Sequence, residues 1–276
     1  MTFADKMAEL AVRALITEVC ITPKPGLVDR ANNGAHRDMN VFTFIDSALT
    51  LHGYFRCITS LSQTHEDDGL LLKLQPLGLQ AEQDMFRVTK GVNTHKGAIF
   101  SLGLICAAAA VLERQSIKQT DEILSQTCAD IVRSRSRLRD AEKAAEKGAA
   151  TKGELVYKRH GLRGILGEAA AGFPAVFEIA LPVLRKFAPG RLEDAAVAAL
   201  IHLIACLDDT NIISRCGLEA LRELQARVKN EISNFTDISQ YLSYAHALDD
   251  EFISRNISPG GCADLLAAAL LVYYML

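Results

Sequence analysis

The sequence predicts an all-α protein, a single compact multi-helix domain that encloses a buried polar active-site cleft. Apolar residues recur with helical periodicity along nearly the whole chain, whereas the strict two-residue alternation of a half-buried strand is hard to find. Aromatic residues make up only 6% of the 276 residues, while Ala and Leu are abundant, which favours close-packed helices over sheets. With 49% hydrophobic residues and no linker-like segment, the whole range 1–276 can bury one large core.

The periodic segments predict helices at 3–20, 40–61, 74–89, 95–114, 120–147, 168–187, 192–208, 215–231, 236–253 and 259–275. Some of these helices have explicit start signals. Thr120 followed by Asp121 and Glu122 offers a cap and first-turn acids that suit the helix dipole. Ser258 followed by Pro259 offers a capping hydroxyl and a proline at the first helical position.

Three stretches, 22–39, 151–167 and 256–261, interrupt the helical pattern and are dense in polar groups. In the first, Pro23 and Pro25 fix φ, whereas Gly26 and Gly34 permit sharp turns. A loop of this length within a compact helical domain is uncommon unless it binds something. This stretch is therefore a candidate binding loop.

Charge and composition argue against several classes of protein. The net charge of −3 predicts no nucleic-acid partner and no membrane surface. The seven cysteines form no CxxC pair, and Met1–Lys6 lacks the apolar segment of a secretory signal, so we expect a cytoplasmic protein. The apolar run Leu265–Leu276 is too short to cross a bilayer and predicts a buried helix.

The range 133–163 is locally basic, with ten Lys and Arg residues against four acids. A solvated helix followed by a loop would account for this charge. This is the favoured explanation, and the alternative is a rim or lid that attracts polyanions.

The stretch Leu207–Arg215 is the strongest functional signal. It follows an apolar run, so Asp208 and Asp209 arrive where a buried helix should be ending, and buried charges need partners, a metal or a ligand. Helical spacing would place Asp208, Asn211 and Arg215 on one face. The carboxylates could hold Mg²⁺ beside substrate phosphates, or one could act as a general base. The alternative is an ion pair in which Arg215 neutralises Asp208.

Two predicted helix starts offer anion sites. A helix start exposes free N–H groups, and Asn93 or Thr94 can cap the helix that carries Lys96 and Gly97. The paired glycines of the 258–264 segment indicate close backbone approach, either to a phosphate or to another helix. Ordinary capped helices would explain both segments.

Together these blocks resemble triphosphoribosyl-dephospho-CoA synthase, the family that serves citrate lyase and malonate decarboxylase. The resemblance runs in order over nearly the whole chain, through Glu18, 22–39, 91–97, 207–215 and 258–266. Cys216 and Cys262 stand where the family pattern has Gly and Ser, and Leu166 replaces an arginine.

The resemblance implies a transferase. The 2′-hydroxyl of 3′-dephospho-CoA attacks the anomeric carbon of the ATP ribose and expels adenine. The product is the precursor of an acyl-carrier-protein prosthetic group, and it passes to a carrier-protein loading enzyme. ATP is then a co-substrate, and Mg²⁺ is the implied divalent cation.

The resemblance also implies residue roles. The catalytic candidates are Asp208, Asp209, His36 and Asp38, and the metal candidates are Asp208, Asp209 and Glu18. Either His36 or His95 would help adenine leave. The remaining substrate-binding candidates are Lys24, Asp29, Arg30, Asn93, Thr94, Lys96, Arg163, Glu168, Asn211, Ser214, Arg215, Ser258, Gly260, Gly261 and Asp264.

Two other functions remain open. A metal-dependent N-glycosidase, such as an ADP-ribosyl hydrolase, also uses clustered aspartates but takes water as the acceptor. A non-catalytic nucleotide- or CoA-binding protein would bind ATP without turnover. Neither the client enzyme nor the oligomeric state follows from the sequence.

Overall fold

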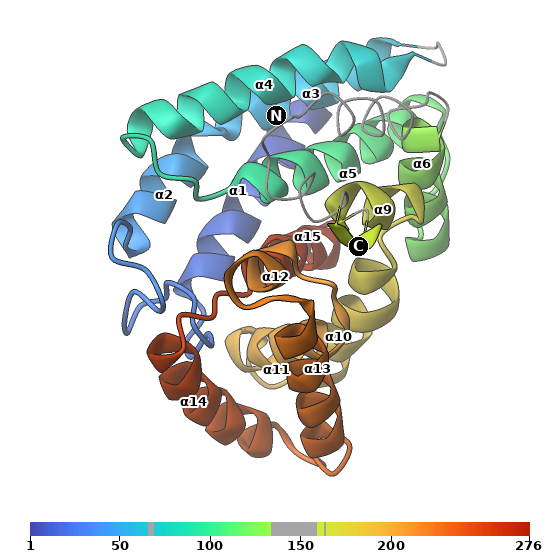
Figure 1. Ribbon diagram of the computed structural model, residues 1–276. Helices are drawn as coiled ribbons and strands as arrows, with labels where there is room; N and C mark the ends of the chain where they lie inside the picture. Colours follow the sequence, from blue (N-terminus) through green and yellow to red (C-terminus); the bar gives the residue numbers. More distant parts are fainter. Residues whose placement is uncertain (66–68, 134–158, 163) are drawn as a thin grey trace.

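The structure is a computed structural model that describes residues 1–65, 69–133, 159–162 and 164–276, and every regular element within these ranges is helical (Figure 1). The all-α prediction is confirmed. The elements are α1 (Phe3–Cys20), α2 (Val41–Thr50), α3 (His52–Thr64), α4 (Leu70–Val88), α5 (Lys96–Arg114), α6 (Asp121–Arg133), α9 (Gly164–Ala170), the π-helix η1 (Ala175–Ala180), α10 (Leu181–Phe187), α11 (Leu192–Cys206), α12 (Thr210–Cys216), α13 (Leu218–Ile232), α14 (Ile238–Ser254) and α15 (Gly260–Met275).

Local signals set several helix starts. Thr2 and Asp5 form a capping box at α1, in which each side chain accepts the backbone N–H of the other residue. Asp237 and Gln240 form a second capping box at α14. These reciprocal bonds satisfy N–H groups that have no partner inside the helix.

Two predicted helices are wrong because the chain bends within them. The segment 40–61 is divided at Leu51 into α2 and α3. The segment 168–187 is interrupted after α9, where Gly172 (φ +84°) and Phe173 (φ +58°) are left-handed and the helices on either side lie 78° apart. A glycine with positive φ is a common helix terminator. Part of the predicted helix 120–147 and most of the basic range 133–163 lie outside the described residues.

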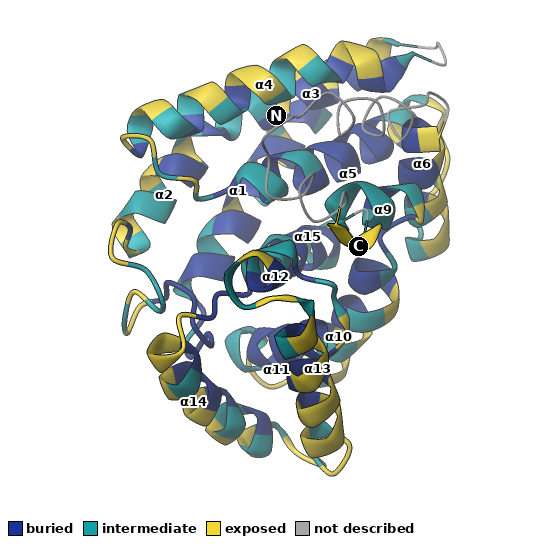
Figure 2. Ribbon diagram, in the orientation of Figure 1, coloured by how far each residue is buried: buried dark blue, intermediate teal, exposed yellow. Residues whose placement is uncertain are grey.

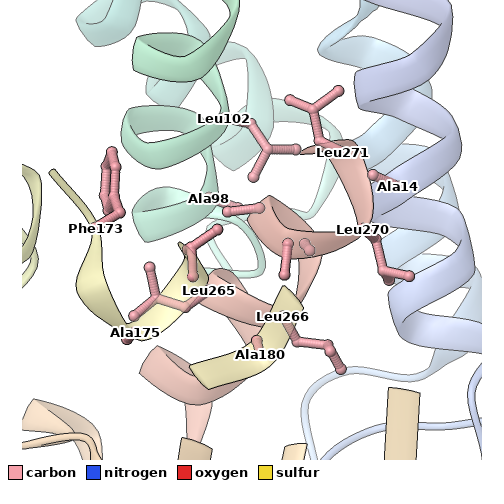
Figure 3. Packing of buried hydrophobic residues seen from close by; sticks show 14 of the residues in the cluster. Ala14, Ala98, Leu102, Phe173, Ala175, Ala180, Leu265, Leu266, Leu270 and Leu271 are labelled. Atoms are coloured by element: carbon pink, nitrogen blue, oxygen red, sulfur yellow. The ribbon is translucent and has the colours of Figure 1, made fainter. Parts of the chain in front are cut away.

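The helices α5, α11 and α15 occupy the centre of the molecule and are buried along most of their lengths (Figure 2). Figure 3 shows Ala98 and Leu102 of α5 close to Leu265 and Leu271 of α15. Small side chains allow these helices to approach closely, and the four alanines 107–110 are fully buried. The predicted burial of the C-terminal apolar run is confirmed.

By length and composition α5 alone among the described helices could cross a bilayer, and each of two bent helix pairs could do so if counted as one span. In the structure 72% of the apolar window of α5 is buried against the rest of the chain. The apolar surface of α5 is therefore used in the core.

Candidate active site

The two adjacent aspartates lie in a short non-helical connection. α11 ends before Asp208 and α12 begins after Asp209, with a bend of 60° between the helices. The expectation that Asp208, Asn211 and Arg215 share one helical face is therefore wrong. Asp209 is extended (φ −66°, ψ 110°), and its side chain accepts the N–H groups of Asn211 and Ile212 at 2.7 and 3.3 Å. Aspartate is a favoured N-cap, which accounts for the break.

Asp209 also joins the start of α12 to the start of α15. Its second carboxylate oxygen accepts the backbone N–H of Cys262 at 2.9 Å. A Cβ atom at Gly261 would lie 3.0 Å from that oxygen, and one at Gly260 would lie 2.9 Å from the amide of Asn211. The paired glycines thus let one helix start approach another. Asp209 is 1% exposed, and burial raises its pKa although the three N–H groups oppose the shift.

Asp208 is partly exposed and has a different partner. Both of its carboxylate oxygens accept hydrogen bonds from the guanidinium of Arg222 on α13. Gln225, one turn further along α13, contacts Arg222 and donates to the carbonyl of Leu207 at 2.8 Å. The ion pair that the sequence suggested with Arg215 is therefore made by Arg222 instead.

The 22–39 loop carries a buried ion pair against the end of α1. The ammonium of Lys24 lies 2.5 Å from a carboxylate oxygen of Glu18, and these side chains are 1% and 5% exposed. Burial raises the pKa of Glu18, while Lys24 opposes the shift and Asp29 adds to it. Asp29 itself accepts the N–H groups of Lys24, Ala31 and Asn32, so it shapes the loop.

Asp249 of α14 holds the same loop from the other side. Its carboxylate accepts the N–H of Gly26 at 2.9 Å and the side-chain amide of Asn32 at 2.8 Å. Gly26 has φ +66°, and a Cβ atom there would lie 2.2 Å from the carbonyl oxygen of Ile257. Only glycine fits this contact, which presses the loop against the segment before α15.

The tip of the loop reaches the start of α15. The Nε2 atom of His36 lies 2.9 Å from the hydroxyl of the buried Ser258. Arg215 donates to the side-chain oxygen of Asn256 at 2.9 Å, close to the same loop. Asp38 is exposed and lies 3.9 Å from Nδ1 of His36.

The start of α5 completes the arrangement. Asn93 accepts the N–H of Lys96 at 3.2 Å, and the Lys96 ammonium pairs with Glu82 at 2.8 Å. His95 is the N-cap residue and is 3% exposed. Thr94 points into the protein, where it donates to a buried serine of α2.

Asp264 links α15 to this helix start. A Cβ atom at Gly97 would lie 2.0 Å from a carboxylate oxygen of Asp264, and the carboxylate accepts the N–H of Ala98. Burial and the nearby Glu18 and Asp209 raise the pKa of Asp264 well above its ordinary value. The starts of α5 and α15, the end of α1 and the 207–209 connection therefore meet around one acidic cluster.

Other candidates lie beside this cluster or at its rim. Glu168 interacts electrostatically with Asp208, and burial raises its pKa. Gly164 lies close to Thr210, so α9 begins beside α12. Arg163 lies outside the described residues. The exposed candidates are Arg30, Asp38, Asn93 and Ser214.

The proposed metal ligands have separate partners. Glu18 pairs with Lys24, Asp208 pairs with Arg222, and Asp209 caps α12. Within the described ranges no three His, Cys, Asp or Glu side chains form a metal-binding group. Mg²⁺ commonly takes only one or two carboxylates and completes its shell with water and substrate phosphates.

Sequence reasoning missed several groups that build the site. Arg222 and Asp249 lie on helices whose charge patterns look like ordinary solvated faces. Ser47 is fully buried on α2 and carries no signal in the sequence beyond a serine in an apolar helix. No local pattern could have found them, because each acts on a segment distant in the sequence.

Comparison with known proteins identifies the family of the chain. Residues 4–276 match the CitG family, described as ATP:dephospho-CoA triphosphoribosyl transferase. A 2-(5″-triphosphoribosyl)-3′-dephosphocoenzyme-A synthase of Pectobacterium atrosepticum is 41% identical over 270 residues, which cover 95% of this chain and 86% of that protein. A probable synthase of the same name from Pectobacterium carotovorum is 43% identical with the same coverage. One from Citrobacter koseri is 43% identical over 96% of this chain and 89% of its own length.

The match covers every segment that meets at the acidic cluster, from Glu18 to Asp264. It also covers more than two thirds of each of these relatives. The chain therefore belongs to the ATP:dephospho-CoA triphosphoribosyl transferase family and is a transferase.

Proposed function

We propose that the chain moves the 5-triphosphoribosyl group of ATP to the 2′-hydroxyl of 3′-dephospho-CoA and releases adenine. The observation that carries the proposal is the meeting of distant helix ends around Glu18, Asp209 and Asp264, with Lys24 and His95 beside them. A nucleotide triphosphate requires cations and N–H donors, and a reacting ribose requires carboxylates. This cluster supplies both kinds of group.

The bond changes define what the side chains must do. The bond from the ribose C1′ to adenine N9 breaks, and its electron pair leaves with adenine. A bond from the acceptor oxygen to C1′ forms, the hydroxyl loses its proton, and adenine gains one. The transition state resembles an oxocarbenium ion, which nearby carboxylates stabilise. We assign the base to Asp208 or Asp209, the two aspartates of the 207–209 connection, with Asp38 as a further candidate at the rim.

Mg²⁺ would enter with ATP and neutralise the charge of the triphosphate. The acidic cluster supports this role because Glu18 and Asp209 each lie near Asp264, as their effect on its pKa indicates. One or two of Glu18, Asp208 and Asp209 would ligate the ion, and phosphate oxygens and water would complete its shell.

The cations and helix starts would bind the phosphates. Lys24 lies in the cluster, Lys96 is at the start of α5, and Arg215 contacts the segment before α15. Arg30 is exposed on the same loop as Lys24 and would act at the rim. Backbone N–H groups at the starts of α5 and α15 would add further donors.

We also propose that residues 1–276 form one domain, that the reaction takes place in the cytoplasm, and that the product passes to an enzyme that loads a carrier protein. The continuous hydrophobic core from α1 to α15 supports the proposal of a single domain. The seven free thiols support a reducing compartment.

The decisive experiment is mass spectrometry of the products after incubation with ATP, Mg²⁺ and 3′-dephospho-CoA. We expect adenine together with a dephospho-CoA adduct that carries one triphosphoribosyl group. Undiminished adenine release without dephospho-CoA would indicate hydrolysis instead, and tight ATP binding without any product would indicate a binding protein.

A further inference from the structure

The imidazole of His95 has a buried nitrogen with no hydrogen-bond partner among the described residues. His95 is 3% exposed, and its Nε2 atom is wholly buried and unpaired. Buried polar atoms are nearly always paired, so an unpaired one requires an explanation. At a candidate active site the simplest explanation is a ligand that supplies the partner.

The other ring nitrogen contacts a hydroxyl group, and the bonds of that hydroxyl indicate the tautomer of His95. Its Nδ1 atom lies 2.8 Å from the hydroxyl oxygen of Ser47, and that oxygen accepts a hydrogen bond from the hydroxyl of Thr94, also at 2.8 Å. Ser47 is fully buried, so its own proton needs an acceptor, and Nδ1 of His95 is within reach. If Ser47 donates to Nδ1, the neutral ring carries its proton on Nε2.

The surroundings of the ring keep it neutral. Burial and the positive charge of Lys24 lower the pKa of His95 to about 3. The imidazole can therefore donate a hydrogen bond at neutral pH, but it does not hold a second proton to give away. The ring also packs edge-to-face with Phe44, with 5.1 Å between the ring centroids.

We propose that Ser47 and Thr94 position His95 so that its Nε2–H donates a hydrogen bond to a ring nitrogen of adenine while the base departs. This inference rests on the proposed function and deepens it. As the C1′–N9 bond breaks, its electron pair spreads over the purine, so N3 and N7 become stronger acceptors. His95 keeps its proton, and the proton that adenine gains is balanced by the one that the acceptor hydroxyl loses.

Adenine is a better partner for this nitrogen than a phosphate. A phosphate is best neutralised by a cation, whereas the His95 ring is neutral. A neutral donor beside an aromatic ring suits an uncharged heterocycle. In this assignment Ser47 and Thr94 are positioning residues, and His95 touches the leaving group.

The first test is spectroscopic. In protein labelled with ¹⁵N-histidine, we expect Nε2 of His95 to be protonated and Nδ1 to be unprotonated. Ser47→Ala should add a population protonated on Nδ1, while the buried serine variant Ser62→Ala, whose hydroxyl bonds within α3, should leave the His95 signals unchanged. A wild-type ring protonated on Nδ1 would overturn the inference.

The second test is kinetic and uses ATP, 3-deaza-ATP and 7-deaza-ATP with dephospho-CoA. His95→Leu should slow adenine release from ATP by roughly 10²-fold, the scale expected for losing one transition-state donor. His95→Gln, which keeps an N–H near the Nε2 position, should recover part of that loss.

With one of the two deaza analogues, the wild-type chain should already release the base slowly. His95→Leu should not slow this release further, because the analogue and the substitution remove the same hydrogen bond. If His95→Leu slowed the reaction of both analogues by the same factor as the reaction of ATP, adenine would be excluded as the hydrogen-bond partner of His95. If the wild-type chain released no adenine at all, the proposed function would fail. The tautomer of His95 and a shift of its Nε2 resonance on ATP binding would then test separately whether the ring contacts the bound nucleotide.

Discussion

The carboxylate of Asp209 accepts the backbone N–H of Cys262 at 2.9 Å and so fixes the start of α12 against the start of α15. The thiol of Cys262 adds a second bond to the same carboxylate, so both the backbone and the side chain of this residue contact Asp209. Because Asp264 lies on the first turn of the same helix, this bond also sets how the acidic cluster is arranged.

Asp209→Ala removes three hydrogen bonds to backbone N–H groups at once. We expect the free energy of unfolding in urea to fall by about 1–3 kcal/mol and the rate of adenine release to fall by roughly 10²-fold. Asp237→Ala, at the exposed cap of α14, is the control and should lose less stability, with no change in rate. An Asp209→Ala enzyme with the wild-type rate would refute a catalytic role for this residue.

Gly97→Ala tests how closely α5 and α15 must approach. The new methyl group would lie 2.0 Å from a carboxylate oxygen of Asp264, so one helix start has to move. We expect a loss of about 1–3 kcal/mol in unfolding free energy and a large drop in activity. Gly53→Ala on α3 has nothing within 4 Å and should be neutral or stabilising by up to about 1 kcal/mol. If Gly97→Ala and Gly53→Ala changed stability and activity equally, the close packing of α5 against α15 would be contradicted.

Asp264→Asn tests the cost of a charge beside Glu18 and Asp209. Burial and neighbouring acids raise the pKa of Asp264 above its ordinary value of 3.8, so the folded state holds the proton more tightly than the unfolded state. Its contribution to stability is thus present below pH 3.8 and is lost as the pH rises towards the raised pKa.

We therefore expect Asp264→Asn to be more stable than wild type at neutral pH but not at low pH, and to be less active. Urea unfolding at several pH values measures the difference. If the difference in unfolding free energy between the two proteins did not change with pH, the raised pKa assigned to Asp264 would be contradicted.

Arg222→Gln tests whether the Asp208 carboxylate must be held in place. The pair is half exposed, so its loss should change the unfolding free energy by less than about 1 kcal/mol. If Asp208 takes part in the reaction, adenine release should slow by roughly 10-fold because the carboxylate is no longer oriented. Arg227→Gln breaks a similarly exposed pair with Glu251 and should leave the rate unchanged. If Arg222→Gln and Arg227→Gln both released adenine at the wild-type rate, the orientation of Asp208 by Arg222 would play no part in the reaction.

Much of this molecule follows from local patterns. Helical periodicity and abundant alanine predict an all-α fold, because a helix satisfies its own backbone hydrogen bonds and exposes a face that its own sequence defines. The prolines and glycines of 22–39 likewise predict a loop at the site, because they restrict or release φ wherever they occur.

The tertiary structure decided where the predicted helices are interrupted and which side chains contact each other. Asp208 and Asp209 are adjacent in the sequence, yet only Asp209 is buried, where the start of α15 packs against it and supplies the N–H of Cys262. Arg222, Asp249 and Ser47 reach the site from helices whose own sequences are unremarkable. Their roles depend on contacts between segments far apart in the chain, and such contacts exist only after the helices have packed.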